Sequence, residues 1–107
     1  MSAGAEIGRL AATIEARRAA GAQESWTARL LAAGPEKCAE KFGEEAIEAV
    51  IEAVRGDPDA LAREAADVLY HLLVMCAARG VALADVEAEL ARRAGTSGLA
   101  EKAARRT

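Results

Sequence analysis

The two prolines constrain the fold of this chain most, because each stands where a helix can begin. Pro35 follows a glycine, and Pro58 follows a Gly-Asp pair. Proline favours the first helical position, glycine the position just after a helix end, and aspartate the N-cap. This punctuation predicts two long helices, over residues 35–55 and about 58–79. The connection between them is short enough to make them antiparallel.

The rest of the sequence is also typical of helices. Ala, Leu, Glu and Arg dominate, and β-branched runs are absent. Apolar spacings and turn residues predict further helices over about 4–20, after Ser25, and over about 84–93. We therefore expect an all-α bundle of about five helices with the two long antiparallel helices at its centre. Residues 96–107 are expected to be a flexible or short-helical tail.

Composition limits the class of protein. The 107 residues suit a single domain over 1–107, but 29 are alanine and only three are aromatic, so the core is thin and a homodimer is expected. A net charge of -3 argues against nucleic acid as a partner. With neither an apolar run of membrane length nor a signal-like start, we expect no membrane partner and a cytoplasmic protein. The two distant cysteines are interpreted as free thiols.

Helical periodicity predicts which faces are buried. Each long helix has an apolar arc that we expect to face the core. On the first the arc is Phe42, Ala46, Ala49, Val50 and Ala53, and on the second it is Leu61, Ala65, Val68, Leu69, Leu72 and Cys76.

Carboxylate pairs flank both arcs. Glu45 and Glu48 are three residues apart, as are Glu64 and Asp67, so each pair lies on one side of its helix. In an antiparallel hairpin the two pairs can meet. Four clustered carboxylates cannot all stay ionised without a cation, and oxygen ligands suit Mg²⁺, with Mn²⁺ as an alternative. Because Mg²⁺ usually keeps water or phosphate ligands, this interpretation predicts a polyphosphate substrate.

The same spacing has a structural interpretation. Glutamates three or four residues apart are common on solvated helices, and Lys37 and Lys41 could simply pair with them. The pattern alone leaves both interpretations open. In the metal-site interpretation the two lysines offset the charge of Glu45.

Several stretches resemble a known family. The segment Lys37-Cys-Ala-Glu-Lys-Phe-Gly-Glu-Glu-Ala-Ile-Glu48, followed by Glu64-Ala-Ala-Asp67, is similar to the ExxE…ExxD signature of the all-α, MazG-like nucleotide pyrophosphohydrolases. Ser25-Trp-Thr-Ala-Arg-Leu30 and Glu64-Ala-Ala-Asp-Val-Leu-Tyr-His-Leu-Leu73 further resemble elements of the phosphoribosyl-ATP pyrophosphohydrolases. The resemblance covers nearly the whole chain. It departs at Trp26 and Phe42, where the family commonly has Tyr and a smaller apolar residue.

The resemblance implies hydrolysis of phosphoribosyl-ATP to phosphoribosyl-AMP and pyrophosphate, the second step of histidine biosynthesis, by a Mg²⁺-dependent homodimer. The alternatives are a house-cleaning (d)NTP pyrophosphatase of the same superfamily and a non-enzymatic dimerisation module. We assign residue roles as a hypothesis on the matching positions: Glu45, Glu48, Glu64 and Asp67 for the metal, Glu44 or Glu45 for proton transfer, and Lys37, Lys41, Ser25, Thr27 and His71 for the substrate.

Some of these positions have competing structural roles. Ser25 could be a plain N-cap, Glu44 a solvated helix residue, and His71 a partly buried residue at the edge of the core. Trp26 is expected in the core or a dimer interface rather than against a substrate base.

Overall fold

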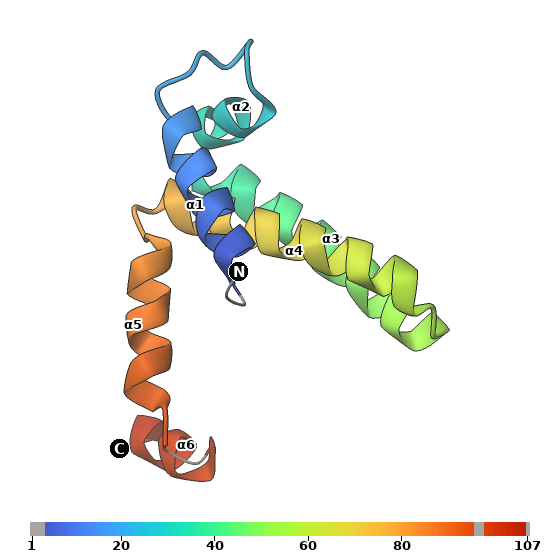
Figure 1. Ribbon diagram of the computed structural model, residues 1–107, viewed down its shortest axis with the longest axis vertical. Coiled ribbons are helices and arrows are strands. Elements are labelled where there is room, and N and C mark those ends of the chain that lie inside the picture. The colour runs from blue at the N-terminus through green and yellow to red at the C-terminus, as the bar shows by residue number, and fades with distance from the viewer. Residues whose placement is uncertain (1–3, 96–97, 107) are drawn as a thin grey trace.

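The computed structural model describes residues 4–95 and 98–106, and within them the chain is all-helical. These described residues form six helices, with bounds α1 (Ala5–Arg17), α2 (Trp26–Ala33), α3 (Pro35–Arg55), α4 (Pro58–Ala78), α5 (Leu83–Arg93) and α6 (Gly98–Arg106). The all-α prediction is confirmed, and the described part of the tail is the sixth helix. Figure 1 shows α3 and α4 as a long hairpin, with α1 and α2 at its base and α5 turning away.

The hairpin connection has the predicted chemistry. Gly56 closes α3 with a positive φ of 85°, a conformation that glycine adopts without steric cost. The carboxylate of Asp57 accepts a hydrogen bond from the Ala60 N–H at 3.1 Å, which caps α4 before Pro58. Both long helices therefore begin where the prolines predict.

α1 is shorter than predicted, ending at Arg17 rather than near residue 20. The next residue, Arg18, donates a hydrogen bond to the carbonyl of Ala77 at 2.7 Å and pairs with Glu15. This contact with α4 is made by residues 59 positions apart, which a local pattern does not reveal. It fixes the end of α1 against the last turn of α4.

The core lies at the base of the hairpin. Its buried side chains come from four helices and are Ile14, Leu30, Cys38, Leu73, Val74 and Ala77. The thiol of Cys38 donates to the carbonyl of Leu30 at 3.2 Å, and burial raises its pKa. Cys38 and Cys76 are both free, as predicted.

The predicted buried arcs are only partly correct. On α3, Val50 is 61% exposed and Ala53 is also exposed; on α4, Ala65 and Leu69 are exposed. The reason is that, within the described residues, the two helices have only each other as neighbours beyond the base (Figure 1), and one helix covers a narrow arc of another. The outer side of α3 thus carries an uncovered apolar face formed by Ile47, Val50, Ile51 and Val54.

In the described ranges, no single helix is long and apolar enough to cross a membrane; α4 and α5 would suffice only together, and they are bent by 106°.

α5 is held partly by its own ion pairs. Glu89 lies 2.7 Å from both Arg92 and Arg93, and hydrogen bonds from Arg92 first and Arg93 second lower the pKa of Glu89 to about 2. Because the pKa of Glu89 is lowered, its ion pairs stabilise α5 at pH values above the ordinary carboxyl pKa. This stabilisation is lost as the pH falls towards 2. Carboxyl NMR should therefore show Glu89 titrating near pH 2. Titration near 4.5 would contradict the pairing.

Candidate functional site

Three of the predicted carboxylates converge across the hairpin. Glu45 and Glu48 on α3 and Glu64 on α4 each place one carboxylate oxygen so that all three lie within 4.8 Å of one another. The predicted antiparallel pairing brings them together, since the first two stand one turn apart on one side of α3. Glu45 and Glu64 are half-buried, whereas Glu48 is exposed.

Glu64 is the member of this cluster whose pKa is raised by burial and by the other carboxylates. Burial, followed by the charges of Glu48, Asp67, Glu45 and Glu52, raises its pKa. One of its oxygens, Oε2, is buried and has no hydrogen-bond partner within the described residues. A buried anionic oxygen without a partner is costly, and a bound cation would satisfy it. The donor set is therefore chemically suited to a hard divalent cation.

Asp67 and Glu52 lie at the edge of the cluster. Asp67 is exposed and stands outside the group of three, although its charge acts on Glu64. Its place as a fourth ligand stays a prediction. Glu52, to which the sequence pattern assigns no role, is half-buried and lies 3.1 Å from Arg55. The spacing of Glu52 from Glu45 and Glu48 puts all three on one face of α3, and this spacing could have indicated that Glu52 lies near the cluster.

The lysines on α3 pair with glutamates other than those of the cluster. Lys41 lies 3.0 Å from Glu44, and Lys37 lies 3.5 Å from Glu40. The pKa of Lys41 is raised, mainly by Glu44 and to a smaller extent by Glu45 and Glu40. Lys41 thus also interacts electrostatically with Glu45. The exposed Glu44 is outside the group of three carboxylates, so its part in proton transfer stays a prediction.

The start of α2 is tied to α4. Ser25 is the N-cap, as its structural interpretation predicted, and accepts a hydrogen bond from the Ala28 N–H at 3.2 Å. The hydroxyls of Thr27 and Tyr70 share a hydrogen bond of 2.5 Å. Ser25 and Thr27, both predicted to contact substrate, therefore also have structural roles, one in capping α2 and the other in joining it to α4.

His71 is placed in the interior. It is 7% exposed, its Nδ1 lacks a hydrogen-bond partner among the described residues, and its ring packs edge-on against Tyr70 with centroids 4.9 Å apart. The structure therefore agrees with the interpretation of His71 as a buried residue. A contact between His71 and the substrate stays a prediction. Among the described residues, His71 is not part of the group formed by the three carboxylates.

An antiparallel helix pair with carboxylates gathered between its members is the arrangement that the all-α pyrophosphohydrolase signature predicts. The sequence profile of the family described as phosphoribosyl-ATP pyrophosphohydrolase matches residues 7–94. The chain belongs to this family, and it is a hydrolase.

Individual relatives agree with the family match. A protein of Jannaschia sp. (strain CCS1) named phosphoribosyl-ATP pyrophosphatase is 74% identical over 96 residues, which cover 90% of this chain and 94% of that protein. A Cereibacter sphaeroides protein of the same name is 75% identical over 97 residues, covering 91% and 94%. One from Ruegeria pomeroyi is 74% identical over 96 residues, covering 90% and 91%. The resemblance inferred from the motifs is confirmed.

Proposed function

We propose that this chain hydrolyses phosphoribosyl-ATP to phosphoribosyl-AMP and pyrophosphate in histidine biosynthesis. The observation that carries the proposal is the family match over residues 7–94, which includes every residue of the carboxylate cluster. Relatives covering at least 90% of the chain bear the name of this activity.

The cofactor we propose is Mg²⁺, with Mn²⁺ as an alternative. Glu45, Glu48 and Glu64 would hold it, with Asp67 as the further ligand; support comes from the convergent oxygens and the unpartnered Oε2 of Glu64. When bound, such a cation neutralises charge on phosphate oxygens and makes a water more acidic.

The chain's own residues would supply binding and proton transfer. In our proposal Glu44 or Glu45 accepts the proton of the attacking water, which requires only hydrogen-bond reach of it. Lys37 and Lys41, one turn apart on α3, would bind the leaving pyrophosphate in exchange for their present partners Glu40 and Glu44. The backbone N–H groups in the first turn of α2, beside Ser25 and Thr27, would favour a substrate phosphate, and that of Ala28 is already bonded to Ser25.

We further propose that the active form is a homodimer. The apolar face of Ile47, Val50, Ile51 and Val54 lies on the side of α3 away from α4, and Val54 is 84% exposed. Contiguous exposed apolar side chains of this kind mark an interaction surface. A second hairpin packed against this face would complete a four-helix arrangement.

The test is the release of pyrophosphate from phosphoribosyl-ATP, with dATP and dCTP as parallel substrates, each with Mg²⁺ and with excess chelator. We expect fast release from phosphoribosyl-ATP alone and none with chelator. Release only from the two dNTPs would transfer the chain to the house-cleaning class. Release that persists in chelator would contradict the metal, and no release from any substrate would contradict the hydrolase.

A further inference from the structure

Trp26 is the large apolar side chain at the start of α2 that the fold does not bury. It is 51% exposed, although Leu30, one turn later on the same side of the helix, is fully buried. Of the two expected positions, the core is therefore wrong, and the dimer interface stays a prediction. The cause is that α2 begins at Trp26, so the indole lies beyond the edge of the core. Half-exposed indole surface is unfavourable in water and gains from a partner.

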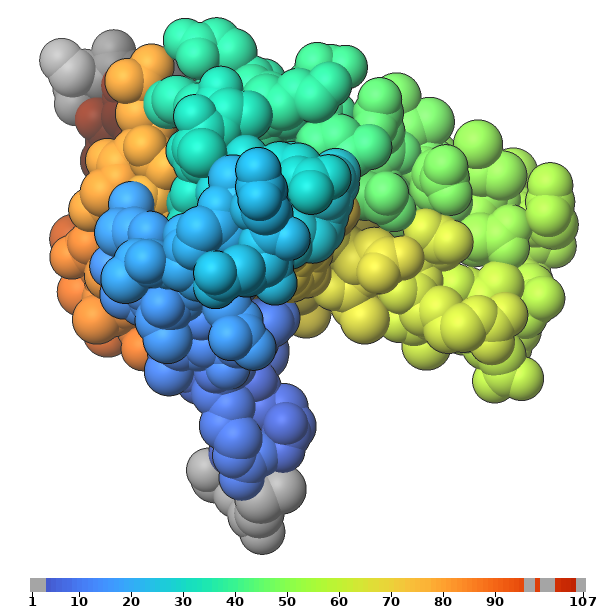
Figure 2. Space-filling view, turned by 90° about the horizontal axis from the view of Figure 1, so that it is seen from above, coloured from blue at the N-terminus to red at the C-terminus, as the bar shows by residue number. Residues whose placement is uncertain are grey.

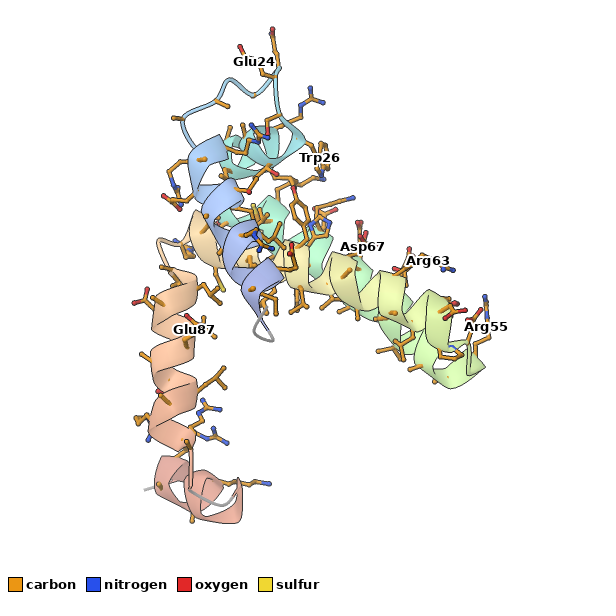
Figure 3. The ribbon with its side chains drawn as sticks, in the orientation of Figure 1. Glu24, Trp26, Arg55, Arg63, Asp67 and Glu87 are labelled. Atoms are coloured by element: carbon orange, nitrogen blue, oxygen red, sulfur yellow. The ribbon has the colours of Figure 1, made fainter. Side chains whose placement is uncertain are left out.

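The contact between α2 and α4 fixes where this indole lies. Thr27, the next residue, is hydrogen-bonded to Tyr70 on α4. Tyr70 follows Asp67 by three residues and Glu64 by six, which is about 4.5 and 9 Å along the helix axis. Figure 3 shows Trp26 on the side of α2 from which the hairpin extends, above Asp67. Seen from above in Figure 2, α2 also lies against the base of the hairpin. Trp26 thus stands within a few turns of the carboxylate cluster.

We propose that Trp26 stacks on the N1-substituted adenine ring of phosphoribosyl-ATP. This inference rests on the proposed function and adds to it the recognition of the base. With the phosphates at the carboxylate cluster, the ribose that joins them to the base would carry the purine towards the start of α2, where the indole lies (Figure 3). The base needs an aromatic surface, and the other two aromatics, Phe42 and Tyr70, are both half-buried.

Charge favours this occupant over an ordinary purine. Alkylation at N1 makes adenine a much stronger base, so the substituted ring carries a positive charge near neutral pH. Tryptophan is the best side-chain partner for a cation held over its face. Trp26 therefore selects the N1-substituted base over the bases of common nucleotides.

The first experiment uses the fluorescence of Trp26, which is the sole tryptophan of the chain. The probes for the unmodified protein are 1-methyladenosine 5′-monophosphate, AMP and ribose 5-phosphate. We expect saturable quenching by the methylated nucleotide, about tenfold weaker binding of AMP, and no change with ribose 5-phosphate. Equal quenching by ribose 5-phosphate, or none by either nucleotide, would overturn the proposal. Trp26 fluorescence that changes only with protein concentration, as expected for a residue in a dimer interface, would also overturn the proposal.

The second experiment compares Trp26→Ala with Trp26→Tyr, which keeps an aromatic face. Trp26→Ala should raise the KM for phosphoribosyl-ATP about tenfold with little change in kcat, while Trp26→Tyr stays near the wild type. An unchanged KM in Trp26→Ala, with the unmodified enzyme active, would refute the stacking alone. An inactive unmodified enzyme would refute the proposed function instead. Circular dichroism and sedimentation of both variants separate a binding defect from a defect of folding or assembly.

Discussion

Replacing Glu48 by glutamine should abolish Mg²⁺-dependent release of pyrophosphate from phosphoribosyl-ATP while the helical content is unchanged. Glu48 is the exposed member of the group that it forms with Glu45 and Glu64, so an amide of the same shape fits without repacking. The substitution removes one negative oxygen ligand. Loss of groups that merely support a ligand costs up to about 100-fold, so loss of a ligand itself should exceed this. Steady-state turnover and calorimetric titration with Mg²⁺ measure both effects.

The same variant carries its own folding control. Ionised Glu48 helps to raise the pKa of Glu64, so its removal relieves repulsion in the metal-free protein. The variant should therefore unfold at no lower a temperature than the wild type when Mg²⁺ is absent. Glu36→Gln, an exposed change in the first turn of α3, is the matched control and should retain activity. Near-normal turnover in Glu48→Gln would refute the metal assignment.

Helix boundaries could be predicted because the signals that set them are local. Gly56, Asp57 and Pro58 stop one helix and start the next through their own backbone preferences and one capping bond. The end of α1 could not be predicted in this way. There Arg18 bonds to a carbonyl of α4, and a contact between residues 59 positions apart has no local signature.

The candidate site was predictable to the extent that it depends on spacing. Glu45 and Glu48 share a side of α3 by periodicity, and the short connection makes the pairing with Glu64 antiparallel. What spacing does not give is the axial offset between two packed helices. That offset decides that Glu52 also acts on Glu64 and that Asp67 lies outside the group of three.

Burial was the least predictable property, because periodicity identifies an apolar face without telling how many neighbours cover it. Val50 was assigned to the buried arc with Phe42, but its direction lies towards the outer face, where the described chain provides no neighbour. His71 shows the opposite case. Its position on a flank suggested partial exposure, yet it is buried, with its ring packed against that of Tyr70.

The uncovered face of α3 leads to the second large effect, on assembly. Ile51→Arg places a charge at the centre of the apolar face that it shares with Ile47, Val50 and Val54. If a second copy covers this face, the arginine would be buried in the interface without a partner, and such a charge is not tolerated there. We expect the wild type to sediment as a dimer and the variant as a monomer at micromolar concentrations.

If the apolar face of α3 is not a dimer interface, Ile51→Arg should leave the oligomeric state unchanged. Ile51 is already 46% exposed in the single chain, so an arginine there costs the isolated fold little and its helicity should persist. Thr13→Arg, an exposed position on α1, is the matched control and should leave the dimer intact. A dimer that survives Ile51→Arg would show that the copies meet elsewhere. A monomer that keeps its helices but melts at a lower temperature would show that covering this face compensates for the alanine-rich core, since a partner that binds only the folded chain stabilises it.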